Sequence, residues 1–86
     1  MNFILTTRFE KAYKSLPEEI KTKVKDALRT LADNFKHPSL HVKKIQGTKD
    51  IWEARVSSDY RITFQVIKGY FILRNVGHHD PTLRNP

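Results

Sequence analysis

Apolar residues in the first half of the chain recur mainly at helical spacing. The apolar run at residues 3–5 predicts a short first strand. Two stripes with a period near 3.6 follow, on either side of Pro17: they are Phe9, Ala12, Tyr13 and Leu16, and then Ile20, Val24, Ala27, Leu28, Leu31 and Phe35. Thr7 and Glu10 fit a capping box at the first helix, and Pro38 ends the second. This pattern predicts an antiparallel helix hairpin.

Alternating apolar and polar residues mark the second half of the chain. Strands are expected over residues 42–46, 51–56, 60–67 and 70–76. Tight turns are expected at residues 57–59 and at Lys68-Gly69, and Gly77 ends the last strand before a coiled tail. The main elements follow the order β-α-α-β-β-β. We therefore predict a single α+β domain over residues 1–86, with the helix hairpin packed on one face of a mostly antiparallel sheet.

The two strands around the 57–59 turn divide cleanly into two faces. Successive side chains of a strand point to opposite sides. The apolar set is Trp52, Ala54, Val56, Ile62, Phe64 and Val66, and the polar set is Glu53, Arg55, Arg61, Thr63 and Gln65. One face of the hairpin is thus a core face. The other carries two guanidinium groups and is suited to hold phosphate.

The overall charge of the chain favours an anionic partner. Sixteen Lys and Arg against nine Asp and Glu leave a net charge of +7 in 86 residues. Such a surplus favours RNA, DNA, an acidic protein segment or a membrane surface. The absence of cysteine excludes disulfides and thiolate metal sites, and is compatible with a reducing cytosol. We find neither a signal peptide nor an apolar run long enough to span a membrane.

Three short segments carry a resemblance to a known family. They read Trp-Glu-Ala-Arg-Val at residues 52–56, Asp-Tyr-Arg-Ile-Thr-Phe at 59–64 and Leu-Arg-Asn-Val-Gly-His-His-Asp at 73–80. Together with the β-α-α start, they resemble the RelE/ParE toxin superfamily of toxin–antitoxin modules over essentially the whole chain. The resemblance implies a small cytoplasmic toxin that a cognate antitoxin wraps and silences. Most relatives cut mRNA without a metal, commonly on the ribosome, whereas ParE-type relatives inhibit DNA gyrase.

Metal-free RNA cleavage requires proton transfer and a cation on the scissile phosphate. The resemblance places Arg61 at the phosphate-binding position of ribonuclease members, and Arg55 shares its parity on the neighbouring strand. The Gly-x-His element makes His79 the expected proton-transfer group and His78 the less important histidine. We therefore expect Arg61, His79 and Arg55 to be the catalytic residues. A surface ion pair is the alternative for each arginine, and a solvated tail is the alternative for His79.

Six further residues are expected to bind or orient the substrate. They are Lys43, Lys44, Arg74, Glu53, Asp59 and Leu83. Leu83 stands where the ribonuclease branch often has a base-stacking aromatic residue, and this departure favours the gyrase inhibitor. Tyr60 shares the parity of Ile62 and is expected in the core. No cofactor or metal is expected, because His78 and its neighbour would point apart on an extended tail and no fourth ligand is evident.

The sequence thus favours a metal-independent endoribonuclease toxin that cleaves mRNA, with an antitoxin and the ribosome as partners. A ParE-like inhibitor of DNA gyrase, which needs no proton-transfer group, is the main alternative. A catalytically silent family member that only binds a partner is the third interpretation.

Overall fold

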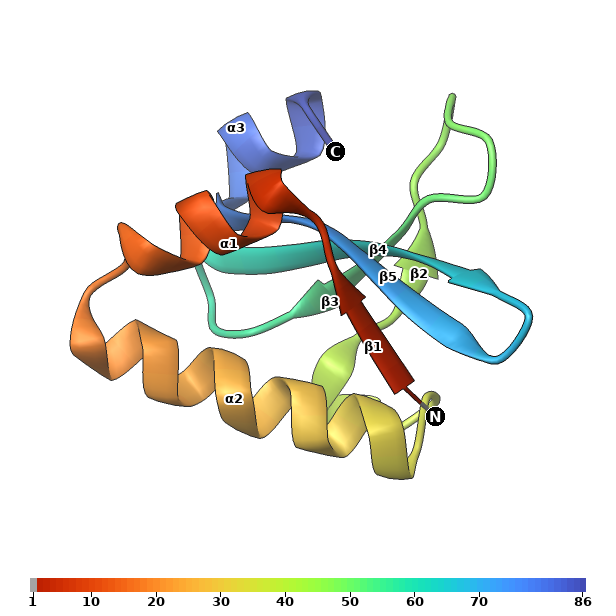
Figure 1. Ribbon diagram of the computed structural model, residues 1–86, viewed down its shortest axis with the longest axis horizontal. Coiled ribbons are helices and arrows are strands. Elements are labelled where there is room, and N and C mark those ends of the chain that lie inside the picture. Colours follow the sequence, from red (N-terminus) through yellow and green to blue (C-terminus); the bar gives the residue numbers. More distant parts are fainter. Residues whose placement is uncertain (1) are drawn as a thin grey trace.

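Five strands form one sheet in the order β1-β5-β4-β3-β2 in the computed structural model, which describes residues 2–86 (Figure 1). The strands are β1 (Asn2–Leu5), β2 (Lys43–Lys44), β3 (Trp52–Arg55), β4 (Tyr60–Ile67) and β5 (Tyr70–His78). β1 runs parallel to β5, and the other neighbours are antiparallel. The predicted α+β layout is confirmed. The strand expected over 42–46 is only two residues long, and this strand, β2, forms one edge of the sheet.

The helix hairpin supplies the apolar layer that covers one face of the sheet. It consists of α1 (Thr7–Lys14) and α2 (Glu18–Asp33), which run in opposite directions in Figure 1, and the short helix η1 (Pro38–Leu40) follows. Buried residues from these helices and the strands form one core: Phe9, Val24, Ala27, Leu31, Leu40, Ala54, Ile62, Phe64, Phe71, Leu73 and Val76. The helical stripe and the apolar face of the β3–β4 hairpin therefore meet as the sequence predicts.

The first helix begins one residue earlier than the sequence pattern suggests. Thr6, not Thr7, is the N-cap: its Oγ1 accepts a hydrogen bond from the Phe9 amide at 3.1 Å. The same hydroxyl donates to the Leu73 carbonyl on β5 at 2.8 Å. The predicted capping box of Thr7 and Glu10 is therefore wrong, because this second contact fixes Thr6 at the cap.

A β-bulge changes the side-chain alternation of β5. Thr63 pairs with Asn75, whereas Phe64 pairs with Leu73, so that Arg74 is the additional residue. Leu73 and the core residue Val76 are consequently both buried despite their opposite parity. Arg74 and Val76 have the same parity in the sequence, but the bulge separates them and directs Arg74 to the polar face.

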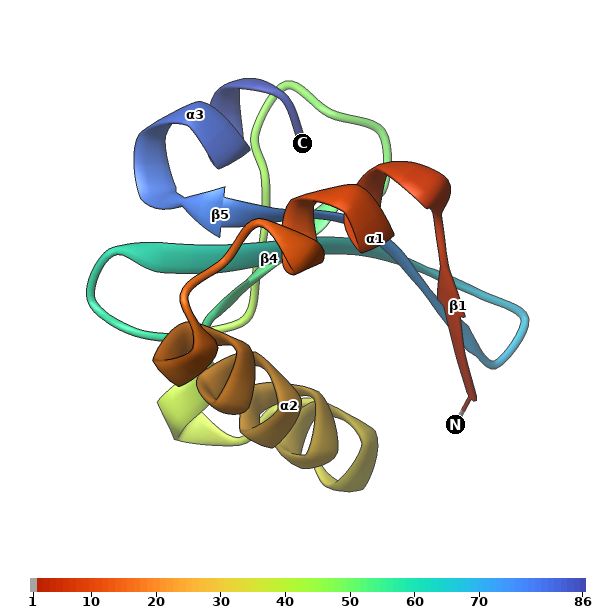
Figure 2. The ribbon, with the colours of Figure 1, turned by 60° about the vertical axis from the view of Figure 1, so that its left-hand side comes forward.

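The C-terminal residues form a helix instead of the predicted coiled tail. β5 continues through Gly77 to His78, and α3 (His79–Arg84) begins at the next residue. A Cβ at Gly77 would lie 2.8 Å from Oγ1 of Thr82, so the missing side chain allows α3 to pack closely on the strand. α3 lies on the opposite side of the sheet from α2 (Figure 2). Within residues 2–86, no helix is long and apolar enough to cross a membrane.

The polar face of the β3–β4 hairpin is less open than the sequence suggests. Thr63 is fully buried and Glu53 is only 6% exposed. Thr63 donates from Oγ1 to the Pro86 carbonyl at 3.2 Å, and β4 packs against α3. Glu53 is therefore a buried carboxylate, although the alternation places it on the polar face. The open part of this face lies beside the 57–59 turn.

Candidate functional site

An open hollow lies between the 57–59 turn and the start of α3. Seven residues line it: Ser58, Asp59, Arg61, His78, His79, Asp80 and Pro81. Strand register explains the gathering, because Tyr60 pairs with His78 and Arg61 pairs with Gly77. The turn before β4 is thereby placed against the junction of β5 and α3. We call this the histidine hollow.

Arg61 enters the histidine hollow with its guanidinium already oriented. Its Nη1 donates to the carbonyls of Ser57 at 2.7 Å, Tyr60 at 3.0 Å and Ser58 at 3.4 Å. Its Nε lies 3.8 Å from Oε1 of Glu53, and the two side chains are only 15% and 8% exposed. Among residues 2–86, Nη2 has no hydrogen-bond partner, so this nitrogen is free to donate to a phosphate oxygen.

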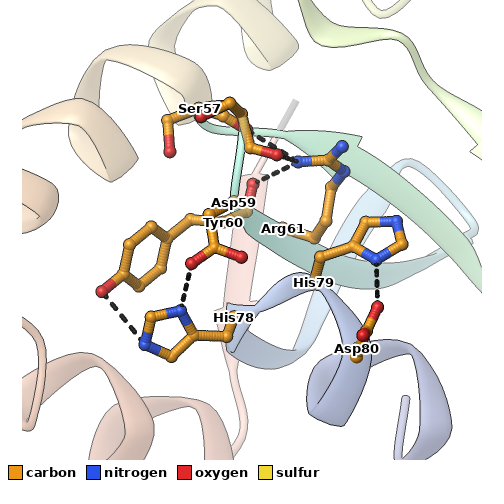
Figure 3. Close-up of polar contacts among 8 residues, drawn as sticks. Ser57, Asp59, Tyr60, Arg61, His78, His79 and Asp80 are labelled. Atoms are coloured by element: carbon orange, nitrogen blue, oxygen red, sulfur yellow. Dashed lines mark hydrogen bonds and ion pairs between the residues drawn. The ribbon is translucent and has the colours of Figure 1, made fainter.

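His78 belongs to a three-residue cluster at one side of the hollow (Figure 3). Its Nδ1 donates to Oδ2 of Asp59 at 2.5 Å. The ring stands against Tyr60 at a centroid distance of 4.5 Å, and the Tyr60 hydroxyl lies 3.4 Å from Nε2. Tyr60 is therefore half-buried against a histidine and is not the core residue that its parity suggested.

His79 is oriented independently of His78. Its Nδ1 donates to Oδ1 of Asp80 at 2.8 Å, and its amide donates to the Asp59 carbonyl at 2.6 Å. The hydrogen bond and charge of His79 lower the pKa of Asp80, with a smaller contribution from Arg84. Nε2 has no partner among residues 2–86, so it remains available for proton transfer. Figure 3 shows this ring on the Arg61 side of the cluster.

Arg55 does not share the histidine hollow. Its Cα pairs directly with that of Arg61, yet Arg55 lines a separate hollow beside α2 and η1, together with Lys23, Thr30 and Ser39. No hydrogen bond or ion pair within residues 2–86 engages its guanidinium. The structure therefore does not bring the two predicted catalytic arginines into one pocket.

The other predicted substrate-binding residues divide between the hollow and its surroundings. Asp59 lines the hollow and Glu53 supports Arg61 from below the surface. Those outside the hollow are Lys43, Lys44, Arg74 and Leu83. Lys44 pairs with Asp50 at 3.6 Å, and Lys43 is exposed at the sheet edge. Arg74 donates to Oε1 of Gln65 at 2.9 Å and to the Pro86 carbonyl at 3.0 Å. Its side chain therefore holds Pro86 against the sheet.

Two participants of the site escaped the sequence interpretation. His78 was expected to be the less important histidine, and Asp80 was not among the expected site residues. The signal for His78 is the strand register, since a β4–β5 pairing that starts at Tyr60 places it next to Asp59. Within residues 2–86, no group of three or more His, Cys, Asp or Glu side chains is placed to hold a metal ion.

Comparison with known families settles the class of protein. Residues 3–81 match the model of the "ParE toxin of type II toxin-antitoxin system, parDE". The chain belongs to this family. It is thus a toxin of a type II toxin–antitoxin system, and the superfamily resemblance noted from its sequence is confirmed.

Solved structures share the fold of this toxin. RelE in the RelB–RelE complex from Methanococcus jannaschii is 24% identical with a TM-score of 0.76, covering 96% of this chain and 99% of that one. YafQ from E. coli strain BL21(DE3) is 16% identical with a TM-score of 0.79, covering 94% and 96%. The YoeB/ParE toxin from Agrobacterium tumefaciens is 14% identical with a TM-score of 0.79, covering 92% and 99%. No curated protein sequence matched the chain.

Proposed function

We propose that this toxin is an endoribonuclease that cleaves mRNA, on the ribosome, without a metal ion. The observation that carries the proposal is the histidine hollow, which is lined by Arg61, His78 and His79. Each of the two imidazole rings is oriented by a hydrogen bond to a carboxylate. A cation and a proton-transfer group beside one open surface are what cleavage of an RNA phosphodiester requires. The net charge of +7 suits a polyanionic substrate.

In this mechanism the 2′-oxygen of a ribose attacks the adjacent phosphorus, and the bond to the 5′-oxygen of the next nucleotide breaks. Arg61 donates from Nη2 to a phosphate oxygen and stabilises the negative charge that develops there. His79 takes the proton of the 2′-hydroxyl at Nε2 and gives a proton to the departing 5′-oxygen, while Asp80 holds its ring. The products are a 2′,3′-cyclic phosphate and a 5′-hydroxyl.

The test follows two processes after the toxin is expressed in bacteria. Incorporation of a labelled amino acid, which reports translation, should stop before incorporation of labelled thymidine, which reports DNA replication. Purified toxin incubated with programmed ribosomes should then leave mRNA fragments with cyclic phosphate and 5′-hydroxyl ends. A chelator selective for zinc and other transition metals, which leaves the magnesium of the ribosomes in place, should not stop this cleavage, since the described residues offer no metal cluster.

A ParE-like inhibitor of DNA gyrase is the second candidate. It is favoured by the family match over residues 3–81 and by Leu83, which lies outside the hollow and offers no ring to stack on a base. If the toxin inhibits gyrase, DNA replication stops first, mRNA stays intact, and the purified toxin inhibits DNA supercoiling by gyrase. That outcome would replace the endoribonuclease.

A cognate antitoxin is the proposed protein partner. The chain's net charge of +7 suits an antitoxin with an acidic segment that covers the histidine hollow. Association driven by such charge is fast and slows as ionic strength rises. An association rate that does not change with salt would show that the antitoxin binds mainly an apolar surface. Inhibition would then not depend on covering the histidine hollow.

A further inference from the structure

One residue of the 57–59 turn contacts both histidines of the hollow. Asp59 accepts a hydrogen bond at Oδ2 from Nδ1 of His78 at 2.5 Å. Its main-chain carbonyl accepts a second one from the amide of His79 at 2.6 Å. The turn before β4 is therefore tied to the β5–α3 junction by one side-chain bond and one backbone bond.

The same turn holds Arg61 in place. The carbonyls of Ser57 and Ser58 accept from its Nη1 at 2.7 and 3.4 Å, and the carbonyl of Tyr60 accepts at 3.0 Å. The position of a guanidinium bonded in this way follows the position of its acceptors. A shift of the turn would consequently move Arg61 relative to a bound phosphate.

The ring of His78 is fixed from two directions. Asp59 binds Nδ1, and the Tyr60 ring packs at a centroid distance of 4.5 Å with an interplanar angle of 32°. The His78 and Asp59 side chains are nevertheless 59% and 61% exposed. An ion pair that exposed contributes little to overall stability. The contact therefore acts on the geometry of the turn more than on the fold.

We propose that His78 is a positioning residue that, through Asp59, holds the 57–59 turn and so aligns Arg61 beside His79. This proposal rests on the proposed function of the histidine hollow. It gives a role to His78, which the sequence indicated as the less important histidine of the adjacent pair. It also assigns the two histidines different tasks: His79 touches the substrate, and His78 acts through Asp59 and the turn.

Two substitutions at position 78 separate positioning from proton transfer. An asparagine amide nitrogen can occupy about the place of Nδ1, but it does not titrate. His78→Ala should lower the single-turnover cleavage rate about tenfold to a hundredfold, with RNA affinity little changed. His78→Asn should restore most of that rate. A His78→Asn protein as slow as His78→Ala would overturn the positioning role.

A double variant tests whether the effect passes through Asp59. Asp59→Ala should slow cleavage as much as His78→Ala, and the variant carrying both changes should be no slower than either alone. Losses that multiply in the double variant would show that the two residues act separately, which contradicts the proposal.

A measurement on the toxin without RNA tests the position of Arg61 independently of cleavage. The Nε–H resonance of Arg61 in nitrogen-15 NMR spectra should shift or broaden in His78→Ala and recover in His78→Asn. Arg29→Ala, which removes an exposed arginine paired with Asp26 on α2, is the control and should leave the resonance unchanged. An unchanged Arg61 resonance in folded His78→Ala overturns the positioning role. A wild-type toxin that cleaves no RNA refutes the proposed function alone, since the spectra still test the positioning.

Discussion

Arg55 and Arg61 lie directly opposite each other on β3 and β4, yet the two residues line different hollows. Arg61 is held by the carbonyls of Ser57 and Tyr60 and by Glu53. Arg55 lies near α2 and η1 instead. Only Arg61 therefore accompanies the two histidines.

Arg61→Ala should lower the rate of RNA cleavage by about two to three decades, because preorganised charge at the phosphate is removed. Arg55→Ala should have a much smaller effect on the same rate, since Arg55 lines the other hollow. Single-turnover cleavage and growth arrest measure both variants, with circular dichroism as the check on folding. A folded Arg61→Ala toxin that cleaves at the wild-type rate would refute the site.

His79→Gln should lower the cleavage rate by about two to four decades while RNA affinity changes little, because a positioned acid–base group is lost. Asp80→Asn should produce a smaller loss, since it removes the charge that orients the ring but keeps the imidazole. Rate and affinity are measured separately by single-turnover kinetics and by binding to an uncleavable 2′-deoxy substrate. Near-wild-type cleavage by His79→Gln would remove this residue from the mechanism.

Gly77→Ala should destabilise the toxin by about 1–3 kcal/mol, because the new methyl overlaps a packed atom. The added Cβ would lie 2.8 Å from Oγ1 of Thr82, a residue that is 3% exposed. Urea unfolding measures the loss. The additional change Thr82→Ala opens this space and should recover part of the stability lost in Gly77→Ala, and the absence of any recovery would place the strain elsewhere.

Asp80→Asn should remove a pH-dependent part of the stability. His79 lowers the pKa of Asp80 below its ordinary value of 3.8, so the folded state favours the ionised carboxyl. This contribution is fully present above pH 3.8 and is lost as pH falls through the lowered pKa. The difference in free energy of unfolding between wild type and Asp80→Asn should therefore shrink on acidification below that value. The pH dependence should weaken in a His79→Gln background, since His79 is its main cause.

Much of the architecture is determined by local sequence pattern. The 3.6-residue stripe from Ile20 to Phe35 and the alternation around the 57–59 turn each specify one apolar face, and burying both faces requires the helices to cover the sheet. The pattern also placed Arg61 off the core. Its pairing with Glu53 depends only on two neighbouring strands with a short turn between them.

Features that depend on contacts between distant residues were decided by the tertiary structure alone. Three such features are the bulge at Arg74, the helix that starts at His79 and the close approach of Gly77 to Thr82. None of them can be read from the spacing of apolar residues along the sequence. The Asp59–His78 bond joins residues nineteen positions apart, and it forms because the β4–β5 register brings the two together. The sequence by itself therefore determined the layers and the placement of Arg61 off the core. Strand register and the packing of α3 decided which histidine orients the turn, because both depend on the complete sheet.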